Sequence, residues 1–433
     1  MKKVCICVLS MASLLSGTLN AQETMKKNKW VPLLGIAALL SVNDAYCKSK
    51  SPRIDVKKYT ESAARQTAGL YDKLMATGER KSPQNFQNGV NRYCAYEGWI
   101  SGFFPGSLWF LYELTGDPQW KTRASEQTER LERIKNLTSD HDIGFRMGCS
   151  YGNGYRITGD PAYRGVLIQS ARSLATRFQP EAGVIMSWNP NKRWKCPVII
   201  DNMMNLELLF NAAIYSGDSS FYKIAVSHAD KTLENHYRAD HSSFHVVDYD
   251  PQTGAVRMKN TAQGYADGSA WARGQAWGLY GFVTCYRFTG DECYLQQAEA
   301  IADFILNHPR LPEDMIPYWD FDAPNIPDEP RDASAGAIAA SALYELALYS
   351  DPKYADAADR MLASLSSDSY TAPVGENGNF ILMHSVGSKP ANSEVDVPIV
   401  YADYYYLEAI YRHRQFKKLK KHLWDGRLPA LGK

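Results

Sequence analysis

A short sequence mark that recurs five times constrains the fold of this chain more than any other feature. Each copy joins the end of one apolar run to the start of the next through Gly-Asp, Gly-Asp-Pro or Asp-Pro. Glycine takes the left-handed conformation that ends a helix, aspartate caps the helix that follows, and proline fits its first turn. Each mark is therefore predicted to be the elbow of a helical hairpin. The five marks are Gly116-Asp117-Pro118, Gly159-Asp160-Pro161, Gly217-Asp218, Gly290-Asp291 and Asp351-Pro352.

Filling in the sequence around the elbows predicts twelve helices. The helix before an elbow is rich in glycine, aromatic and apolar residues, whereas the helix after it is amphipathic and charged. Helices that are apolar all round lie inside a fold, and amphipathic helices lie outside. Six inner and six outer helices predict an all-α fold, an (α/α)6 toroid or barrel of six helical hairpins, whose closure leaves no end to cover. The expected ranges are 54–77, 103–115, 118–136, 145–158, 161–178, 202–216, 218–236, 269–289, 291–307, 332–349, 352–366 and 400–416.

Six long connections precede the inner helices and are expected to emerge on one rim of the ring. They are rich in Trp, Tyr, Asn, Asp, His and Gly, a composition typical of a carbohydrate cleft. Within one of them, the alternation in 243–249 predicts a small hairpin with 255–258. The connections are 79–102, 137–144, 179–201, 237–268, 308–331 and 367–399.

The first 47 residues are predicted to be a signal peptide region. A basic start and an apolar run lead to Ala21, and a second basic start with another apolar run suggests Met25 as the true start. Both runs are too short to predict a membrane span in the mature chain. We expect export to a periplasm, with Cys47 as a possible lipidation site. Residues 48–433 are then expected to form a single domain.

Composition excludes several classes of partner and cofactor. The net charge of +1 over 433 residues gives no basic surface for nucleic acid or an anionic membrane. The five cysteines after Cys47 lack the spacing of a disulfide framework or a metal site. They are expected to be buried as small apolar residues. No metal or other cofactor is expected, and the sequence leaves the oligomeric state open.

Two aspartates stand where a long connection meets an inner helix. Asp201 follows an apolar run and precedes a helix that is apolar on nearly all sides, and Asp142 follows His141 at the end of the preceding connection. Both could be helix N-caps, and His141 with Asp142 could be part of a metal site, although no further ligands cluster in register. Alternatively, they are paired carboxylates on one rim, where repulsion and burial raise one pKa so that this group holds a proton.

The segment 263–280 brings aromatic and charged side chains to the same rim. Trp271 and Trp277 could be core aromatics or sugar-stacking residues. Arg273 lies in the first turn of an inner helix, where a buried guanidinium needs an anionic partner. A substrate carboxylate or a rim aspartate would satisfy it, and the surrounding aromatics favour the substrate. Similar stacking or hydrogen-bonding roles are expected for Trp99, Trp188, His245 and Gln263.

Four motifs on this rim resemble the unsaturated glucuronyl hydrolases, glycoside hydrolase family 88. They are His141-Asp142-Ile-Gly-Phe145, Ile199-Ile-Asp201-Asn-Met-Met-Asn-Leu206, Gln263-Gly264 and Ser269-Ala-Trp271-Ala-Arg273-Gly-Gln-Ala-Trp277, and the resemblance extends from Trp99 to Arg412. It implies an (α/α)6 barrel that removes a 4,5-unsaturated uronic acid from the non-reducing end of oligosaccharides made by polysaccharide lyases. In that chemistry a proton adds to C4, water adds to C5, and the resulting hemiketal opens and releases the sugar.

The resemblance also implies roles for individual residues. Asp201 matches the general acid/base, and Asp142 matches a second essential carboxylate that positions the ring and tunes the first. The loop with Ser385, Ser388 and Lys389 resembles a segment with which some members accept a sulfate or carboxylate of the next sugar. Here the Ser388–Lys389 spacing differs by a residue, so sulfate preference stays open. Substrate-binding positions are implied for Trp99, His141, Trp188, His245, Gln263, Trp271, Arg273 and Trp277.

Two other functions fit parts of the pattern. An unsaturated rhamnogalacturonyl hydrolase would use the same fold and chemistry on pectin fragments, but the motifs around Asp142 and Trp271 favour the glucuronyl type. A non-catalytic carbohydrate-binding toroid would bind sugars without turnover, and the presence of both aspartates argues against it. The expected substrate is therefore a glycosaminoglycan-type oligosaccharide, with the glycan and linkage left open.

Overall fold

A computed structural model describes residues 52–78 and 81–423. The predicted signal peptide region, Met25 and Cys47 lie outside these residues, so those predictions and the single domain over 48–433 stay predictions. The outer helices are α2 (Val56–Ala76), α4 (Pro118–Glu129), α6 (Pro161–Ala175), α8 (Ser219–Asn235), α10 (Glu292–Asn307) and α12 (Lys353–Leu365). The inner helices are α3 (Phe103–Thr115), α5 (Asn153–Thr158), α7 (Leu206–Ser216), α9 (Ala272–Thr289), α11 (Ala333–Tyr349) and α13 (Val400–Leu423).

Four of the five predicted elbows are confirmed in their backbone conformation and in their caps. Gly116, Gly159, Gly217 and Gly290 end inner helices in the left-handed conformation, with φ between 67° and 75°. The aspartate after each glycine caps the next helix, because its side chain accepts a hydrogen bond from a backbone N–H of the first turn. These local rules fix four of the hairpins; at the fifth elbow Ser350 ends α11 with a φ of −133°, and Asp351 accepts a hydrogen bond from the N–H of Lys353.

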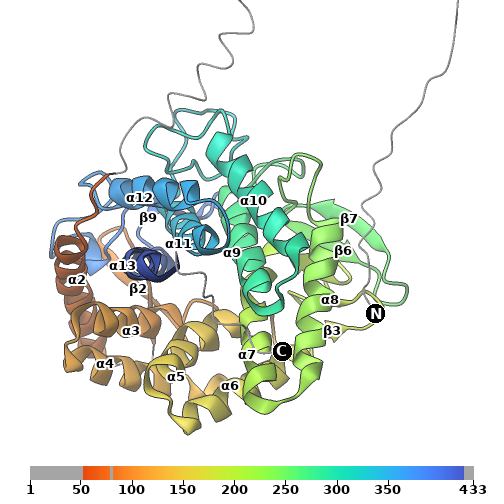
Figure 1. Cartoon of the computed structure of the whole chain (residues 1–433), viewed down its shortest axis with the longest axis horizontal. Coiled ribbons are helices and arrows are strands. Elements are labelled where there is room, and N and C mark those ends of the chain that lie inside the picture. Colours follow the sequence, from red (N-terminus) through yellow and green to blue (C-terminus); the bar gives the residue numbers. More distant parts are fainter. Residues whose placement is uncertain (1–51, 79–80, 424–433) are drawn as a thin grey trace, which may run out of the picture. The chain divides into compact units, whose positions relative to one another are not determined.

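The inner helices close into a ring, which confirms the predicted (α/α)6 barrel (Figure 1). Each contacts its neighbours in chain order, and α13 packs against both α11 and α3, so the last hairpin meets the first. The outer helices pack against inner ones around the periphery. The inner helix α11 is buried along almost its whole length, as its apolar sequence predicts.

Two inner helices begin irregularly, which the sequence did not predict. The predicted helix 145–158 is a π-helix, η2 (Gly144–Gly152), that continues into α5. The predicted helix 202–216 begins as a 3-10 helix, η3 (Ile200–Asn205), that continues into α7. Asp201 is the second residue of η3 and Asp142 lies two residues before η2, and π-helical turns are frequent at functional sites. The predicted range 118–136 likewise divides into α4 and a short 3-10 turn, η1 (Glu132–Ile134).

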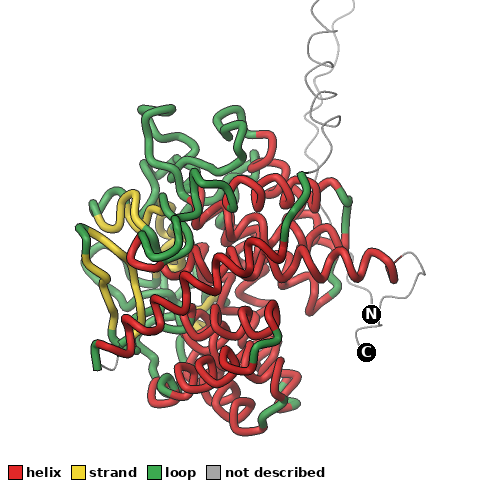
Figure 2. Tube along the Cα trace, turned by 90° about the vertical axis from the view of Figure 1, so that its left-hand side faces the viewer, coloured by secondary structure: helices red, strands yellow, loops and turns green. Residues whose placement is uncertain are grey.

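The six long connections meet one another on one rim, as predicted. Figure 2 shows the strands gathered on one side of the helical ring. The predicted hairpin is confirmed as β6 (Val246–Tyr249) with β7 (Val256–Asn260), and β5 (Pro197–Ile199) extends it to three strands. The remaining strands form three two-stranded sheets that the sequence did not predict: β1 (Ser82–Gln87) with β2 (Val90–Cys94), β3 (Phe178–Gln179) with β4 (Val184–Ile185), and β8 (Ser385–Ser388) with β9 (Ser393–Val397).

The connections are joined to each other and not only to the helices below them. Asn85 of the first connection bridges Ile399 at the end of the last, and β5 of the third pairs with β6 of the fourth. The N–H of Ala333, at the start of α11, donates to the carbonyl of His384 in the sixth connection. No helix within the described ranges is long and apolar enough to span a bilayer.

Candidate active site

Asp201 lies at the start of an inner helix but does not cap it, so the capping interpretation is wrong. It is the second residue of η3, whose N-cap is Ile199. Strand β5 fixes this position, because Ile199 pairs with Val246 and the N–H of Ile200 donates to the carbonyl of His245 at 3.0 Å. The Asp201 side chain is 10% exposed, and its Oδ2 has no hydrogen-bond partner among the described residues. The carboxyl is therefore held in place with one oxygen unpaired.

Asp142 is positioned by a second aspartate, Asp140, and also does not act as a cap. Asp140 Oδ1 accepts a hydrogen bond from the N–H of Asp142 at 2.9 Å. Both Asp140 oxygens accept from the buried guanidinium of Arg146, at 2.7 and 2.9 Å. Burial raises the pKa of Asp140, but the bonds and charge of Arg146 outweigh it and lower that pKa to about 2. Asp140 is therefore a permanent anion that orients the Asp142 backbone.

Ser187 joins the two carboxylate-bearing segments. Its carbonyl accepts a hydrogen bond from the N–H of His141 at 3.1 Å, and its hydroxyl accepts from the N–H of Ile199 at 3.0 Å. Ser187 is fully buried. The backbone just before Asp142 and the backbone just before Asp201 are thus tied to one residue, which brings both aspartates to the same part of the rim.

Burial raises the pKa of both carboxyl groups. The pKa of Asp201 is raised to about 7, chiefly by burial; the positive charge of Arg273 opposes this rise and the negative charge of Asp142 adds to it. The pKa of Asp142 is also raised by burial, against the influence of His141. Because the charge of Asp142 acts on Asp201, the two carboxyls are electrostatically coupled, as expected for an acid/base pair. At neutral pH, Asp201 retains its proton in a large fraction of molecules.

A neutral imidazole faces Asp201. His245 Nδ1 accepts hydrogen bonds from the backbone N–H groups of Ala262 at 3.0 Å and Gln263 at 3.1 Å. These bonds assign the His245 proton to Nε2, which lies 3.7 Å from Asp201 Oδ2. Burial lowers the pKa of His245 to about 3, so the ring stays uncharged. It therefore presents an N–H donor toward Asp201.

A second imidazole lies beside Asp142 in a matching arrangement. The Asn205 amide oxygen accepts from the N–H of Phe145 at 3.1 Å, which leaves its amide nitrogen 3.5 Å from His141 Nδ1. His141 Nε2 lies 3.3 Å from Asp142 Oδ1. An amide donor on Nδ1 assigns the His141 proton to Nε2 in the same way as for His245.

Within the described residues, Arg273 pairs with neither of the two candidate aspartates. Its guanidinium donates to Asp332 at 3.1 Å and to the backbone carbonyls of Val386 and Gly387. Asp332 is the N-cap of α11 and is fully buried. The alternative that Arg273 pairs with Asp142 or Asp201 is therefore wrong, whereas binding of a substrate carboxylate by Arg273, whose Nε has no partner among the described residues, stays a prediction. Arg273 holds the β8 segment, and its positive charge lowers the pKa of Asp201.

Three of the four predicted tryptophans line the rim, and the fourth supports it from below. Trp271 packs beside His245 with ring centroids 4.7 Å apart, and the half-buried Trp188 lies 6.1 Å from the same imidazole. The half-buried Trp99 packs against Phe145 at 5.5 Å. Trp277 is fully buried and contacts Phe145 at 5.1 Å. Its burial favours the alternative of a core aromatic that supports the site floor, and its contact with substrate stays a prediction.

The β8 segment joins the site through Gln263, whose amide donates to the carbonyl of Gly387 at 3.1 Å. Ser385 is fully buried, whereas Ser388 is partly exposed. Lys389 lies 3.7 Å from the carboxylate of Glu329, which is itself only 6% exposed. The lysine expected to receive an anionic group of the next sugar therefore already has an anionic neighbour, which lowers its attraction for sulfate.

Buried polar atoms without partners converge on the two carboxyls. Buried polar groups are nearly always hydrogen-bonded, so a cluster of unpaired ones indicates a place that a polar ligand completes. The unpaired atoms near the site are His141 Nε2, Asp201 Oδ2, His245 Nε2, Trp277 Nε1 and Tyr401 Oη.

Within residues 52–78 and 81–423, no group of three or more His, Cys, Asp or Glu side chains could hold a metal ion.

Several residues that build the site were missed from the sequence. Asp140, Arg146, Ser187 and Asp332 orient other groups and carry no motif of their own. Only Asn205 lay inside a motif that was singled out, and its amide position beside His141 depends on how η2 and η3 pack.

The sequence profile of Glycosyl Hydrolase Family 88 matches residues 70–419. An unsaturated glucuronyl hydrolase of Formosa agariphila is 50% identical over 317 residues, which are 72% of this chain and 79% of the relative. An unsaturated chondroitin disaccharide hydrolase of Streptococcus agalactiae is 35% identical over 371 residues, covering 83% of this chain and 92% of the relative.

Solved structures show the same similarity. The crystal structure of an unsaturated glucuronyl hydrolase specific for heparin aligns with a TM-score of 0.81 and 44% identity, over 84% of this chain and 98% of the other. That of an unsaturated glucuronyl hydrolase from Streptococcus agalactiae aligns with a TM-score of 0.80 and 31% identity, over 92% of this chain and 99% of the other.

Proposed function

The chain belongs to glycosyl hydrolase family 88, and from this premise we propose which residues carry its reaction and on which substrates. The enzyme is a glycoside hydrolase that removes a 4,5-unsaturated uronic acid from the non-reducing end of lyase-generated oligosaccharides. The observation that carries the proposed mechanism is the Asp201 carboxyl, which is buried, unpaired on one oxygen and raised in pKa to about 7.

The first step is protonation of the substrate double bond by Asp201. The C4=C5 bond of the unsaturated uronate is an enol ether conjugated to the ring oxygen, and its C4 is the carbon that accepts a proton. A carboxyl with an ordinary pKa would be ionised at neutral pH, whereas one with a pKa near 7 is both sufficiently protonated and sufficiently acidic. Positive charge then develops at C5 and the ring oxygen.

The second step is addition of water to C5 and opening of the ring. The Asp201 carboxylate takes a proton from the attacking water and returns to its acid form. The hemiketal at C5 opens to a ketone as the bond from C5 to the ring oxygen breaks. The freed hemiacetal at C1 then releases the saccharide, so one water molecule is consumed and the acid is regenerated.

Asp142 acts on both steps through its charge and position. Its negative charge raises the pKa of Asp201 and favours the protonated form before the first step. The same charge would stabilise the positive charge that develops in the sugar ring. Asp140, Arg146 and Ser187 hold it in place through the bonds described above.

The proposed substrates are unsaturated disaccharides of the glycosaminoglycan type. The relatives named above are a glucuronyl hydrolase, a heparin-specific one and a chondroitin disaccharide hydrolase. Because Glu329 lies beside Lys389, we expect unsulfated substrates, or ones sulfated away from this lysine, to be preferred over those that place a sulfate on it.

The test follows the loss of the ultraviolet absorbance of the conjugated double bond. Wild-type protein is offered unsaturated chondroitin, heparin and hyaluronan disaccharides, with and without sulfate, and an unsaturated rhamnogalacturonan disaccharide. Asp201→Asn should lower kcat by at least about a hundredfold while leaving substrate binding nearly intact. The same change at the exposed Asp368 is the matched control. Retained turnover in Asp201→Asn contradicts its role as the acid, and turnover of the rhamnogalacturonan substrate alone would move the enzyme to pectin fragments.

We also propose that the enzyme is exported, on the basis of the N-terminal sequence alone. Mass spectrometry of the mature protein from the periplasm and the membrane fraction tests this, because lipidation would leave an acylated Cys47 at the new N-terminus. Full-length protein that stays in the cytosol contradicts the proposal.

A further inference from the structure

A second cavity opens at the end of the barrel opposite the carboxylates. It has a volume of about 770 Å³ and is lined by inner-helix residues next to the elbows, among them Gly159, Tyr215 and Tyr349. Neither Asp142 nor Asp201 belongs to its lining. We refer to it as the elbow-side cavity.

A layer of aromatic side chains separates the elbow-side cavity from the active site. Phe145 and Tyr405 line the cavity, and both pack against the buried Trp277, at 5.1 and 5.4 Å between ring centroids. Trp277 and Phe145 also form the floor beneath the active-site rim, since Phe145 packs against Trp99. The two spaces are therefore distinct sites that share one aromatic partition.

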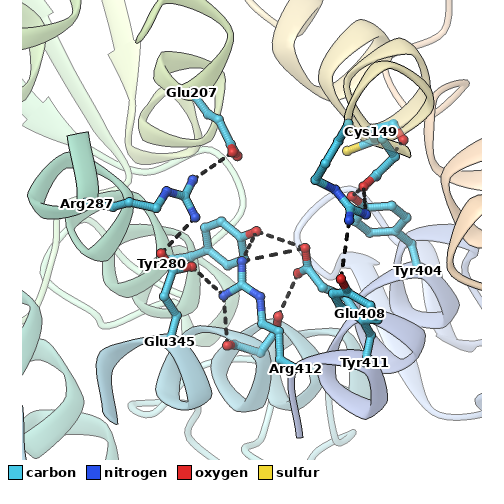
Figure 3. Close-up of polar contacts among 12 residues, drawn as sticks. Cys149, Glu207, Tyr280, Arg287, Glu345, Tyr404, Glu408, Tyr411 and Arg412 are labelled. Atoms are coloured by element: carbon cyan, nitrogen blue, oxygen red, sulfur yellow. Dashed lines mark hydrogen bonds and ion pairs between the residues drawn. The ribbon is translucent and has the colours of Figure 1, made fainter. Parts of the chain in front are cut away.

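Three arginines and three glutamates line the cavity, and all of them except Arg156, which pairs with Glu113, are paired with one another (Figure 3). Arg287 lies 2.7 Å from both Glu207 and Glu345, and Arg412 lies 2.8 Å from Glu345. Glu408 accepts a hydrogen bond from Tyr280 at 3.0 Å. Because the charges compensate each other, the cavity favours neither anions nor cations, but it offers many polar atoms to a neutral ligand.

Two glycines leave space in the cavity at positions where the fold would also accept a larger residue. Gly148 and Gly152 of η2 both line it. A Cβ at Gly148 would meet nothing within 4 Å, and one at Gly152 would meet only an ordinary contact at 3.9 Å. Neither glycine has a positive φ, and a glycine inside a helix is less favourable than an alanine. The space beside them is thus retained although the fold does not require it.

An unpaired hydroxyl points to a polar ligand in this space. Tyr405 lines the cavity, and no described residue forms a hydrogen bond with its hydroxyl. Because Tyr405 lies in the cavity wall, a polar ligand in this space can supply the hydrogen bond that the chain does not. The cavity walls add the rings of Tyr280 and Phe288.

We propose that the elbow-side cavity is a second binding site, for a neutral saccharide of one or two rings. Aromatic faces that pack on sugar C–H groups, with carboxylate and guanidinium groups that bind hydroxyls, form the wall that such a ligand requires. The volume lies within the range of about 300–1,000 Å³ of small-molecule sites. The proposal does not depend on the reaction assigned to Asp201, because it concerns binding at the other end of the barrel.

Titration calorimetry with cellobiose and N-acetylglucosamine tests this inference. Gly148→Met should fill the cavity and weaken binding by at least about tenfold relative to wild type. Gly165→Met is the matched control, because Gly165 is exposed on the outer helix α6 and its Cβ also meets nothing within 4 Å. It should bind as wild type does, and both methionine variants should hydrolyse the unsaturated disaccharide within about twofold of wild type.

Tyr405→Phe keeps the ring and removes only the hydroxyl, so it decides the matter should Gly148→Met fail to fold. It should weaken binding by several-fold without lowering the melting temperature. Equal affinities in wild type and Gly148→Met, or no heat of binding up to about 10 mM saccharide, overturn the proposal. Affinity that is lost with Trp188→Ala and kept with Gly148→Met would assign the binding to the active site and would overturn it as well.

Discussion

Asp201 should make the folded protein less stable as the pH rises, and Asp201→Asn should remove this effect. The pKa of Asp201 is raised by burial from 3.8 to about 7. Below about pH 4 the group is protonated in both the folded and unfolded states and contributes no difference. Between about pH 4 and 7 the unfolded chain releases this proton while the folded protein retains it, so stability falls; above 7 the penalty is constant.

The size of the effect follows from the shift in pKa. A rise of about three units corresponds to about 4 kcal/mol at 1.36 kcal/mol per unit. The side chain is only 10% exposed, so solvent screening reduces this little. At about 2.1 cal/mol/K per residue, the roughly 370 described residues have an unfolding entropy near 0.8 kcal/mol/K. A loss of about 4 kcal/mol in unfolding free energy therefore lowers the melting temperature by about 5 °C.

The assay is the melting temperature of Asp201→Asn minus that of wild type, measured by calorimetry across the pH range. The difference should widen from about pH 4 to about pH 7 by about 5 °C and then level off, because asparagine is neutral throughout. The contributions of other titrating groups to the two melting temperatures cancel in the subtraction. The exception is Asp142, because its charge is coupled to Asp201. Asp368→Asn controls for the loss of an aspartate. A difference that stays flat with pH, or that narrows, refutes the raised pKa and with it the proposed acid.

Three further predictions concern the groups around this carboxyl and the elbows. Ser187→Ala should lower stability by about 1–2 kcal/mol and lower kcat more than it changes KM, because Ile199 loses its acceptor; denaturation and steady-state kinetics measure both. Asp332→Ala should destabilise by about 3–5 kcal/mol in urea unfolding, because it leaves Arg273 buried without its ion-pair partner. Gly217→Ala should lower stability by about 1–2 kcal/mol through its φ of 74° while leaving kcat unchanged.

The barrel could be predicted from the sequence because its elbows obey local rules. A left-handed glycine such as Gly116 and a capping aspartate such as Asp117 act within a few residues, and both are visible in the sequence. The alternation of apolar and amphipathic helices then decides which helices lie inside. The shared location of the two candidate aspartates was also predictable, because each ends a long connection and those connections share a rim.

The partners of these groups could not be predicted, because they come from distant parts of the chain. Arg273 meets Asp332 at a separation of 59 residues, and its two carbonyl partners lie more than 110 residues away. A buried arginine predicts that an anion exists but not which one it is. Ser187 illustrates the same limit, since its role depends on two backbone N–H groups that any sequence could supply.

The π-helix η2 connects the active site with the elbow-side cavity, and this makes the Gly148→Met test demanding. The helix begins two residues after Asp142, supports the active-site floor through Phe145, and opens the cavity at Gly148 and Gly152. A side chain added at Gly148 is therefore only six positions along the chain from Asp142, the second proposed active-site carboxylate. Hydrolysis stays unchanged in this variant only if Asp140, Arg146 and Ser187 hold Asp142 in place when the packing on the cavity side of Phe145 changes. Loss of hydrolysis together with loss of saccharide binding would instead mean that the aromatic partition transmits the change in packing from one site to the other.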